Sequence, residues 1–372
     1  MNVLGIETSC DETAAAVVST TGDDAHPWQM RSNVIASQAS IHREWGGVVP
    51  EMASRQHLRD ICGVVDRALG DAGTPLATID AIAVTQGPGL VGSLLVGVSF
   101  AKAMAATLGK PIVAVHHLAG HIESIFLEHG PIPLPAAVLV VSGGHTSIYL
   151  VPEPGVYHLI GRTRDDAAGE AYDKVARLVG LGYPGGPIID RLARSGNDQA
   201  VALPKLRFTH ADRNPAPADF TGLPRSFGHI ADFSFSGLKT AVVRYLQSRG
   251  AAVDSGLGAP VKAERLPESE VADLCASFQR VVVETLLTRT FETARALGAK
   301  SVGIAGGVSA NSRLRADAAD RARTEGLPVF IPALSLATDN AAMIAAAGLR
   351  KLEHGGTSEL DFNAQATLGI GA

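Results

Sequence analysis

Two histidines four residues apart form the pair whose spacing most clearly suits chemistry. His117 and His121 lie in the segment V-H-H-L-A-G-H-I-E. In a helix, residues four apart share one face, with Cβ atoms about 5–6 Å apart, and two imidazoles so placed can bind one metal ion. An apolar run at 111–115 precedes the pair, and apolar residues at helical spacing follow it. The sequence therefore predicts a buried strand that leads into a helix with two candidate metal ligands.

Other interpretations of this pair remain open at this point. The chain has 12 histidines, so some pairs fall four apart by chance, and two buried imidazoles can be satisfied by ordinary hydrogen bonds. A metalloprotease is disfavoured, because the H-E-x-x-H signature places its general base directly after the first histidine. Leu118 occupies that position.

Length and composition indicate a globular protein with a large core. The 372 residues correspond to about two domains of ordinary size. Hydrophobic residues make up 46% of the chain and charged residues 19%, as is typical of globular proteins. The formal net charge of −5 gives no general attraction to nucleic acid or to an anionic membrane. Binding of nucleic acid would therefore require a local basic patch or a helper subunit.

The chain is expected in a reducing cytoplasm and outside membranes. Its three cysteines are widely separated, with no C-x-x-C pair and no sign of a disulfide framework. Residues Met1–Glu12 have no basic segment of the kind that opens a signal peptide. The most apolar window, Leu90–Ala106, is rich in glycine and alanine and contains Lys102, which predicts a buried helix and not a membrane span.

The predicted elements form two successive runs with the same beginning. Each run starts with an apolar strand, a short polar turn and a second apolar strand, and the two turns lie at 7–13 and 142–146. Further strands and helices then alternate in each run, which predicts two α/β domains. Glycine-rich turns after strands, at 86–89 and 306–311, place backbone amides at helix starts, where anions bind or chains pack closely.

Nine motifs in order along the chain resemble those of the tRNA N6-adenosine threonylcarbamoyltransferase family, formerly called O-sialoglycoprotein endopeptidases. The resemblance runs from end to end, apart from stretches at 214–219 and 251–267 that we expect to be surface insertions. The motifs are G-I-E-T-S-C-D-E-T at 5–13, G-G-V-V-P-E at 46–51, Q-G-P-G-L-V-G-S-L at 86–94, H-H-L-A-G-H at 116–121, V-S-G-G-H-T at 141–146, G-E-A-Y-D-K at 169–174, Y-P-G-G-P at 183–187, G-G-V-S-A-N at 306–311 and T-D-N at 338–340.

The resemblance implies a fold of the actin, sugar-kinase and heat-shock-chaperone superfold. Two ribonuclease-H-like α/β domains would face each other across a central cleft. We place the first domain at 1–109, joined by a C-terminal helix within 340–372, and the second domain at 110–339. The second domain is expected to hold both the metal and the acyl donor.

The resemblance also implies a metal site and a donor site. The metal ligands would be His117, His121 and Asp339, holding one transition metal ion per subunit, with iron(II) ahead of zinc, although nitrogen and oxygen ligands alone do not separate the two metals. The donor, threonylcarbamoyl-AMP, would lie along Val140, Val141, Ser142, Gly143, Gly144, Asp173, Gly186, Asp190 and Asn311. Apart from the resemblance, the two aspartates would be interpreted as solvated charges on helix faces.

The implied reaction is acyl transfer to tRNA. N6 of adenosine 37, in tRNAs that read codons beginning with A, attacks the carbamoyl carbon, and AMP leaves. The metal can polarise an oxygen of the donor, and amides of the turn at 142–144 can stabilise developing charge. The general base stays open between His145 and Glu12, and a structural role is an equal alternative for His145. Valine at Gly143 or Gly306 is expected to abolish donor binding without unfolding the chain.

The expected partners are the anticodon loop of tRNA, threonylcarbamoyl-AMP, an inactive paralogous subunit and a small ATPase, with no membrane. Basic residues near the second-domain turns are candidates for contact with the RNA, although each alone fits a solvated helix face: Arg191, Arg194, Lys205, Arg207, Arg225, Lys239 and Arg244.

Two other functions remain as alternatives on the same superfold. An ATP-dependent small-molecule kinase would hold Mg²⁺ through carboxylates and water, and would have no use for a histidine pair. A non-enzymatic nucleotide-binding scaffold is the other alternative. A bound transition metal would count against both.

Overall fold

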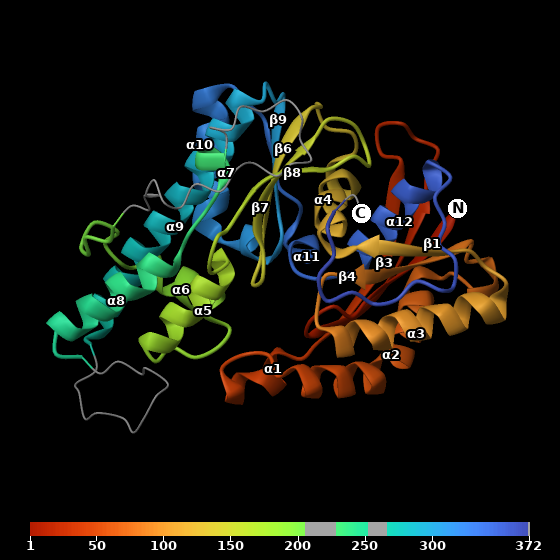
Figure 1. Cartoon of the computed structure of the whole chain (residues 1–372), viewed down its shortest axis with the longest axis horizontal. Coiled ribbons are helices and arrows are strands. Elements are labelled where there is room, and N and C mark those ends of the chain that lie inside the picture. Colours follow the sequence, from red (N-terminus) through yellow and green to blue (C-terminus); the bar gives the residue numbers. More distant parts are fainter. Residues whose placement is uncertain (205–227, 252–265, 371–372) are drawn as a thin grey trace. The chain divides into compact units, whose positions relative to one another are not determined.

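The computed structural model describes residues 1–204, 228–251 and 266–370, which form two α/β units. Unit 1 comprises Met1–Leu134, Val151–His158 and Phe330–Ala372, and unit 2 comprises Pro135–Leu150 and Leu159–Val329. Each unit is built around a five-stranded sheet (Figure 1). The predicted insertions at 214–219 and 251–267 lie largely outside the described residues, as do Lys205, Arg207 and Arg225.

The sheet of unit 1 mixes antiparallel and parallel pairing. Its strand order is β3-β2-β1-β4-β5. The strands β1, β2 and β3 pair antiparallel, whereas β4 and β5 continue the sheet parallel to β1. The carboxyl ends of β1, β4 and β5 therefore meet at one edge of the sheet. The strands are β1 (Asn2–Glu7), β2 (Glu12–Thr20), β3 (Trp28–Ser37), β4 (Ala81–Gly87) and β5 (Ile112–His116).

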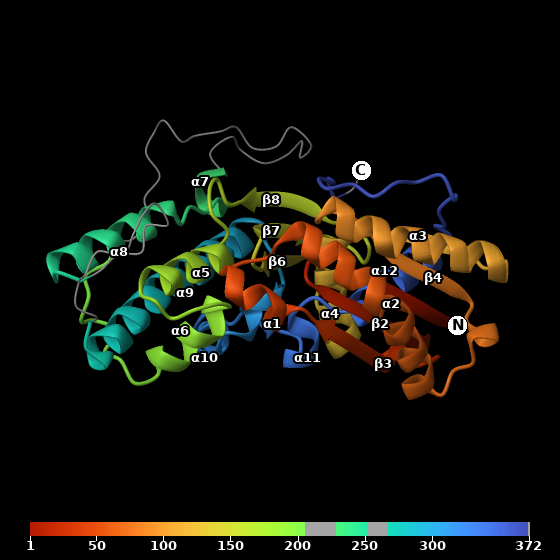
Figure 2. The same ribbon diagram turned by 90° about the horizontal axis from the view of Figure 1, so that it is seen from below.

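Helices cover both faces of this sheet. The helices α2 (Pro50–Ala72) and α3 (Val91–Leu108) lie side by side along one face (Figure 2). Because side chains alternate along a strand, Leu4 and Ile6 enter the core on that side, whereas Gly5 faces α12 (Ala341–Glu353). A Cβ on Gly5 would lie 2.2 Å from the carbonyl oxygen of Ala341, so glycine allows α12 to contact the strand backbone.

The division of the chain differs from the predicted boundary at residue 109. Strand β5 pairs with β4 in the first sheet, and the helix after it, α4 (His117–His129), packs against α12. A parallel strand needs sheet neighbours for its backbone hydrogen bonds, so β5 and α4 stay with unit 1. The division falls after Leu134, and the histidine pair belongs to unit 1 instead of the second domain.

Helix α3 is the one helix of the described residues that is long and apolar enough to cross a membrane, and 39% of it is buried. Its inner side, including Leu94 and Val98, is buried in unit 1. On its outer side Leu95 is 48% exposed and lines an apolar groove of about 330 Å³ together with Leu58 of α2. The helix therefore belongs to the core of unit 1 and leaves an apolar strip on the surface.

The sheet of unit 2 repeats the first one. Read from β8, its order is β8-β7-β6-β9-β10. In both sheets the strands therefore follow the order third, second, first, fourth, fifth, which confirms the predicted repeat. Strands β6 and β9 are parallel, and α9 packs against both. The strands are β6 (Ala136–Val141), β7 (Thr146–Val151), β8 (His158–Arg162), β9 (Ser301–Ala305) and β10 (Val329–Phe330).

The helices of unit 2 pack against one another. Helix α9 contacts α6 and α10, and α5 contacts α6 and α8. They are α5 (Ala168–Leu178), α6 (Gly185–Ala193), α8 (Ser236–Ser248), α9 (Glu268–Ala296) and α10 (Ser312–Glu325). Short turns of helix complete the two units: α1 (Ala39–His42), η1 (Arg43–Trp45), η2 (Leu76–Thr78), α7 (Gly228–Ala231), η4 (Gly307–Ala310) and α11 (Leu334–Ala337).

Candidate metal centre and donor-binding turns

Helix α4, which carries His117 and His121, begins directly after β5 without a connecting loop. Strand β5 ends at His116, which is also the N-cap residue of α4. Its Nδ1 accepts a hydrogen bond from the backbone N–H of Leu118 at 3.1 Å, and its Nε2 lies 3.0 Å from the carbonyl oxygen of Leu368. His116 is therefore engaged by the helix start and by the C-terminal segment, while His117 and His121 follow on the helix itself.

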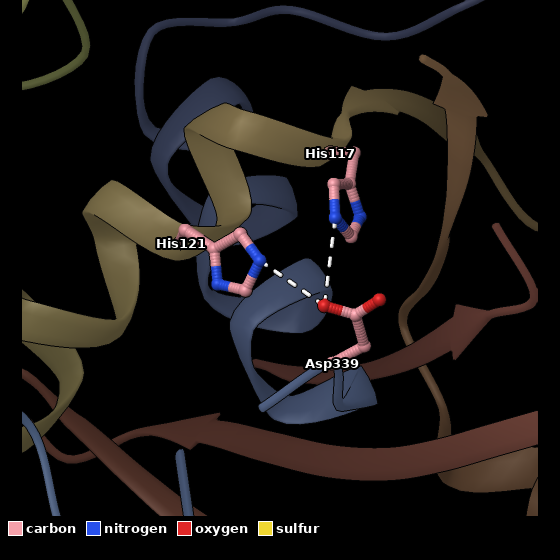
Figure 3. A group of neighbouring side chains, drawn as sticks. All are labelled: His117, His121 and Asp339. Atoms are coloured by element: carbon pink, nitrogen blue, oxygen red, sulfur yellow. Dashed lines mark ion pairs between the residues drawn. The ribbon is translucent and has the colours of Figure 1, made fainter. Parts of the chain in front are cut away.

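Asp339 comes from a different part of the chain and meets both histidines. It lies just before α12, whose N-cap Asn340 accepts a hydrogen bond from the backbone N–H of Met343. Its Oδ1 is 3.2 Å from Nε2 of His121 and 3.6 Å from Nε2 of His117, and Figure 3 shows both rings directed at this carboxylate. One ligand atom from each of the three residues lies within 4.8 Å of the others.

The three residues fit a metal ion. His121 is fully buried, and neither of its ring nitrogens has a hydrogen-bond partner among the described residues, although Nε2 is within ion-pair distance of Asp339. A buried imidazole without hydrogen bonds is energetically costly. His121 therefore argues against the interpretation that the two histidines are satisfied by hydrogen bonds alone. Two imidazoles and one carboxylate are common ligands of iron and zinc and leave coordination positions open.

The surrounding charges favour a cation at this place. Burial disfavours the charged form of His117, but the carboxylates of Asp339 and Glu7 outweigh burial and raise its pKa to about 9. Burial would likewise raise the pKa of Glu7, yet the charge and hydrogen bond of His117 hold it below its ordinary value. Two carboxylates therefore stand next to two buried imidazoles, and a bound cation would compensate their charge.

Glu7 is a residue of this site that the sequence analysis did not identify. Its segment was predicted to be a short polar turn, but its side chain is fully buried and reaches His117. Ser9 comes from the same turn, and its Oγ lies 3.2 Å from Nδ1 of His117. One signal in the sequence was available: Glu7 is a carboxylate at the end of an apolar strand, β1. This strand is parallel to β5, the strand that precedes the two histidines.

A second unexpected neighbour is the C-terminal segment after α12. The backbone N–H of Ser358 donates to the carbonyl of Ile112 at 2.8 Å, and that of Gln365 donates to Gln86 at 2.9 Å. A Cβ on Gly87 would lie 2.1 Å from the carbonyl oxygen of Gln365. The glycine-rich turn at 86–89 therefore serves close packing of this segment, one of the two roles that its sequence suggested.

In unit 2 the turn between β6 and β7 is open on one side. The backbone N–H of Ser142 donates to the carbonyl of His145 at 2.8 Å and closes the turn. A Cβ on Gly143 or Gly144 would meet no atom within 4 Å. The structure therefore leaves free space above the backbone where the sequence predicted the donor. Val140 and Val141, by contrast, are fully buried, so they offer at most backbone groups.

Gly306 has a different role from Gly143. Its φ is +93°, and a Cβ there would lie 2.4 Å from the carbonyl oxygen of Val141. Glycine is needed at this position so that β9 and β6 end close together. The expectation that valine at Gly306 would leave folding intact is therefore wrong, because the side chain would meet backbone of the protein itself.

The polar residues predicted for the donor are already engaged within unit 2. Asp173 Oδ1 accepts a hydrogen bond from the backbone N–H of Gly185 at 2.7 Å. Asp190 Oδ1 accepts from the hydroxyl of Ser312 at 2.8 Å, and its other oxygen pairs with Arg194 at 3.2 Å. These contacts attach both aspartates to helix starts. Arg194, a candidate for contact with the RNA, is thus paired with a residue predicted for the donor.

The remaining predicted donor residues lie at the starts of α6 and α10. A Cβ on Gly186 would meet no atom within 4 Å. Asn311 is the N-cap of α10, where its Oδ1 accepts from the backbone N–H of Leu314 at 2.9 Å. Its Nδ2 donates to Oε1 of Gln279 at 2.8 Å. Gln279, a buried residue of α9, thus fixes the orientation of the Asn311 amide.

The two candidate bases lie in different units. Glu12 opens β2 in unit 1, where burial, followed by Asp11 and Asp339, raises its pKa well above the ordinary value. His145 belongs to the turn of unit 2, and its backbone N–H donates to Oγ of Ser142 at 3.2 Å. A raised pKa suits a carboxylate that accepts a proton near neutral pH.

Two solved structures show a similar fold. The chain matches full-length HypF in its phosphate- and nucleotide-bound form with a TM-score of 0.55 and 13% identity, over 95% of this chain and 55% of that chain. It matches component A of the (R)-2-hydroxyglutaryl-CoA dehydratase of Acidaminococcus fermentans with a TM-score of 0.50 and 15% identity, over 95% and 99%. With its two repeated sheets, the chain has the fold of the actin, sugar-kinase and heat-shock-chaperone superfold.

Sequence comparison then gives the family. The model of the tRNA N6-adenosine threonylcarbamoyltransferases matches residues 29–346. The enzyme of that name from Koribacter versatilis is 47% identical over 98% of both chains, and the one from Cyanothece sp. is 49% identical over 99% of this chain and 97% of its own. The chain belongs to this family. It is thus an acyltransferase of tRNA modification, and the kinase and scaffold alternatives are set aside.

Proposed function

We propose that this chain transfers the threonylcarbamoyl group from threonylcarbamoyl-AMP to N6 of adenosine 37 in tRNAs that read codons beginning with A. N6 forms a bond to the carbamoyl carbon, the bond from that carbon to the phosphate oxygen breaks, and AMP leaves. The N6 proton passes to a base. The observation that carries the proposal is the buried group of His117, His121 and Asp339 in a member of this family.

The metal site is proposed to hold one transition metal ion per subunit, with iron(II) preferred over zinc as its identity. Nε2 of both histidines and Oδ1 of Asp339 would be its ligands. When bound, such an ion supplies Lewis acidity toward a donor oxygen. The histidines have to bind it as neutral imidazoles, so loading releases the proton that the two carboxylates stabilise on His117.

The donor is proposed to bind on unit 2 along the open turn. The space above Gly143 and Gly144 admits a phosphate or acyl group close to backbone, and amides of this turn can stabilise charge on an oxygen. Asp173 of α5 is hydrogen-bonded to the start of α6, and Asp190 of α6 to the start of α10. In this role, their carboxylates would accept hydrogen bonds from the ribose hydroxyls.

The proton of N6 needs an acceptor, and the same two candidates remain. The raised pKa of Glu12 favours this residue, because a carboxylate with an ordinary pKa is a weak base at neutral pH. His145 adjoins the proposed donor turn and is the second candidate.

The proposed partners follow from the charge and from the apolar surface. A net charge of −5 implies weak binding of tRNA by the chain alone, because affinity for nucleic acid comes largely from neutralising phosphates. The target base must leave its stack, which favours an anticodon loop. The apolar groove between α2 and α3 supports a protein partner, for which we propose the paralogous subunit, with a small ATPase as the third component. The assembly is proposed to act in the cytoplasm.

Mass analysis of tRNA nucleosides tests the proposed function in cells. Depleting this protein should remove threonylcarbamoyladenosine and leave other modified nucleosides unchanged. A wild-type copy should restore the modification, whereas a His121→Ala copy should not. Persistence of the modification after depletion would contradict the proposal.

A further inference from the structure

Three neighbouring strand ends bring Glu7, Thr85 and His117 together. Strands β1, β4 and β5 are parallel, and Ile6 is paired with Val84. The next residues along β1 and β4 are Glu7 and Thr85, and His117 directly follows β5. The topology of the sheet therefore places a carboxylate beside a metal ligand that is 110 residues away in the chain.

Both oxygens of the Glu7 carboxylate are occupied by donors from the protein. Oε1 accepts the backbone N–H of Ser9. Oε2 accepts the hydroxyl of Thr85 at 2.7 Å and lies 3.1 Å from Nδ1 of His117. An ionised carboxylate can only accept hydrogen bonds, so Nδ1 of His117 has to bear a hydrogen. The lone pair of the neutral ring then lies on Nε2, the nitrogen that faces Asp339.

His121 has no comparable partner. Neither of its ring nitrogens is hydrogen-bonded to a described residue. Glu7 itself is not among the three residues that could share a cation, and it contacts the side of the His117 ring opposite to Asp339. We propose that Glu7 is a positioning residue, which fixes the tautomer and the orientation of His117 so that its Nε2 is ready to bind the metal.

This role rests on the metal site of the proposed function and adds a residue that acts through a ligand. A carboxylate that orients a metal-bound histidine typically changes metal affinity by about tenfold to hundredfold when it is lost. Burial alone does not explain the arrangement, because Glu123 of α4 is also fully buried in unit 1. Glu123 accepts from Tyr157 at 2.6 Å and pairs with Arg350 at 3.2 Å, and no metal ligand is among these partners.

Glu7→Gln tests the proposal, with Glu123→Gln as the matched control. A glutamine offers one accepting oxygen and one NH₂ group to the three donors around position 7, so one donor loses its partner or His117 moves its proton to Nε2. The affinity of the full-length chain for Zn²⁺ would be measured by competition with a chromophoric chelator. We expect Glu7→Gln to weaken binding about tenfold to hundredfold and Glu123→Gln to bind as the wild type does.

A second measurement separates positioning from general stability. In the Zn²⁺-loaded wild type, nitrogen-15 spectra of the imidazoles should show a proton on Nδ1 of His117 that is protected from exchange. Thr85→Val, which keeps the carboxylate, should retain this signal and lose less affinity than Glu7→Gln. Glu7→Asp, whose shorter side chain draws the carboxylate back, should lose affinity even if Glu7→Gln does not fold.

Two results would have different meanings. In the first case the wild type binds Zn²⁺, and Glu7→Gln either keeps the wild-type affinity or loses no more affinity than Glu123→Gln does. Glu7 would then have no positioning role, and the proposed metal site would be unaffected. If the wild type itself takes up no Zn²⁺ that depends on His117 and His121, the proposed metal site is wrong, and the role of Glu7 is lost with it.

Discussion

The turns that follow the first strand of each sheet occupy equivalent places in the repeated fold, but they are built in different ways. At the end of β1, the side chain of Glu7 is buried against His117. After β6, Gly143 and Gly144 leave free space above the backbone. The same strand order thus gives a buried group of candidate ligand side chains in unit 1 and an open backbone turn in unit 2.

The difference fits the proposed function, in which unit 1 holds the metal and unit 2 binds the donor. In the proposed metal site, the carboxylate of Glu7, itself held by Thr85, orients His117 before a metal binds. A turn that admits a phosphate needs exposed amides and little side-chain volume, which glycine provides. Variants on the two sides should therefore fail in different ways.

The largest effect is expected from the metal ligands. His117→Ala and His121→Ala should each remove the bound metal and abolish transfer, because two ligands alone do not make the proposed site. The fold should persist, since α4 stays anchored by its other buried side chains. Emission spectroscopy measures the metal and circular dichroism the fold. Stoichiometric metal in the double variant would show that the ligands lie elsewhere.

The next effect separates two glycines of unit 2. Gly306→Val should prevent folding or cost more than about 4 kcal/mol, because it combines a φ of +93° with a backbone clash. Gly143→Val should fold and lose affinity for a non-hydrolysable threonylcarbamoyl-AMP analogue. Calorimetry measures the binding, and urea unfolding measures the stability. Normal donor affinity in a folded Gly143→Val protein would remove the turn from the donor site.

Local pattern was enough to predict the two runs of strands and helices and the histidine helix. Assigning each strand to its sheet was harder to predict. Strand β5 joins unit 1 because it pairs with β4, and sequence spacing does not reveal that pairing. Glu7 was not identified for the same reason, because its partner His117 follows β5, which is separated from β1 by β4 in the sheet. The role of Gly306 depends on its contact with Val141, which also arises only in the folded chain.

A smaller effect concerns His116, which adjoins helix α4. Burial, partly offset by its hydrogen bond to Leu368, lowers the pKa of His116 to about 4. The unfolded chain takes up this proton near its ordinary pKa of 6.5, so stability is fully present above that pH and falls as the pH drops toward 4. The loss is at most about 3 kcal/mol.

Urea unfolding between pH 7 and pH 4 would measure this loss, with His116→Gln as the comparison. Glutamine keeps an acceptor and a donor but does not titrate in this range. The free energy of unfolding should therefore depend less steeply on pH in the variant. Equal slopes for the two proteins would mean that His116 does not contribute.

The smallest effect on the chain itself is expected at the groove between α2 and α3. Leu58→Asp and Leu95→Asp change exposed side chains, so the free energy of unfolding should shift by only about 0.5 kcal/mol and metal binding should remain. Association with the paralogous subunit should be lost in light scattering. A stable complex formed by the double variant would place that partner on another surface.

The most direct test titrates metal and activity together. The purified full-length chain, stripped with a chelator and combined with its partners, the donor and tRNA, would receive increasing amounts of Fe²⁺ or Zn²⁺ while threonylcarbamoyladenosine is measured by mass spectrometry. Product formation should rise in proportion to bound metal, saturate at one ion per chain, and stay absent in His121→Ala. Full product formation by the stripped wild type, or by His121→Ala, would contradict the assignment of His117, His121 and Asp339 as the centre of the reaction.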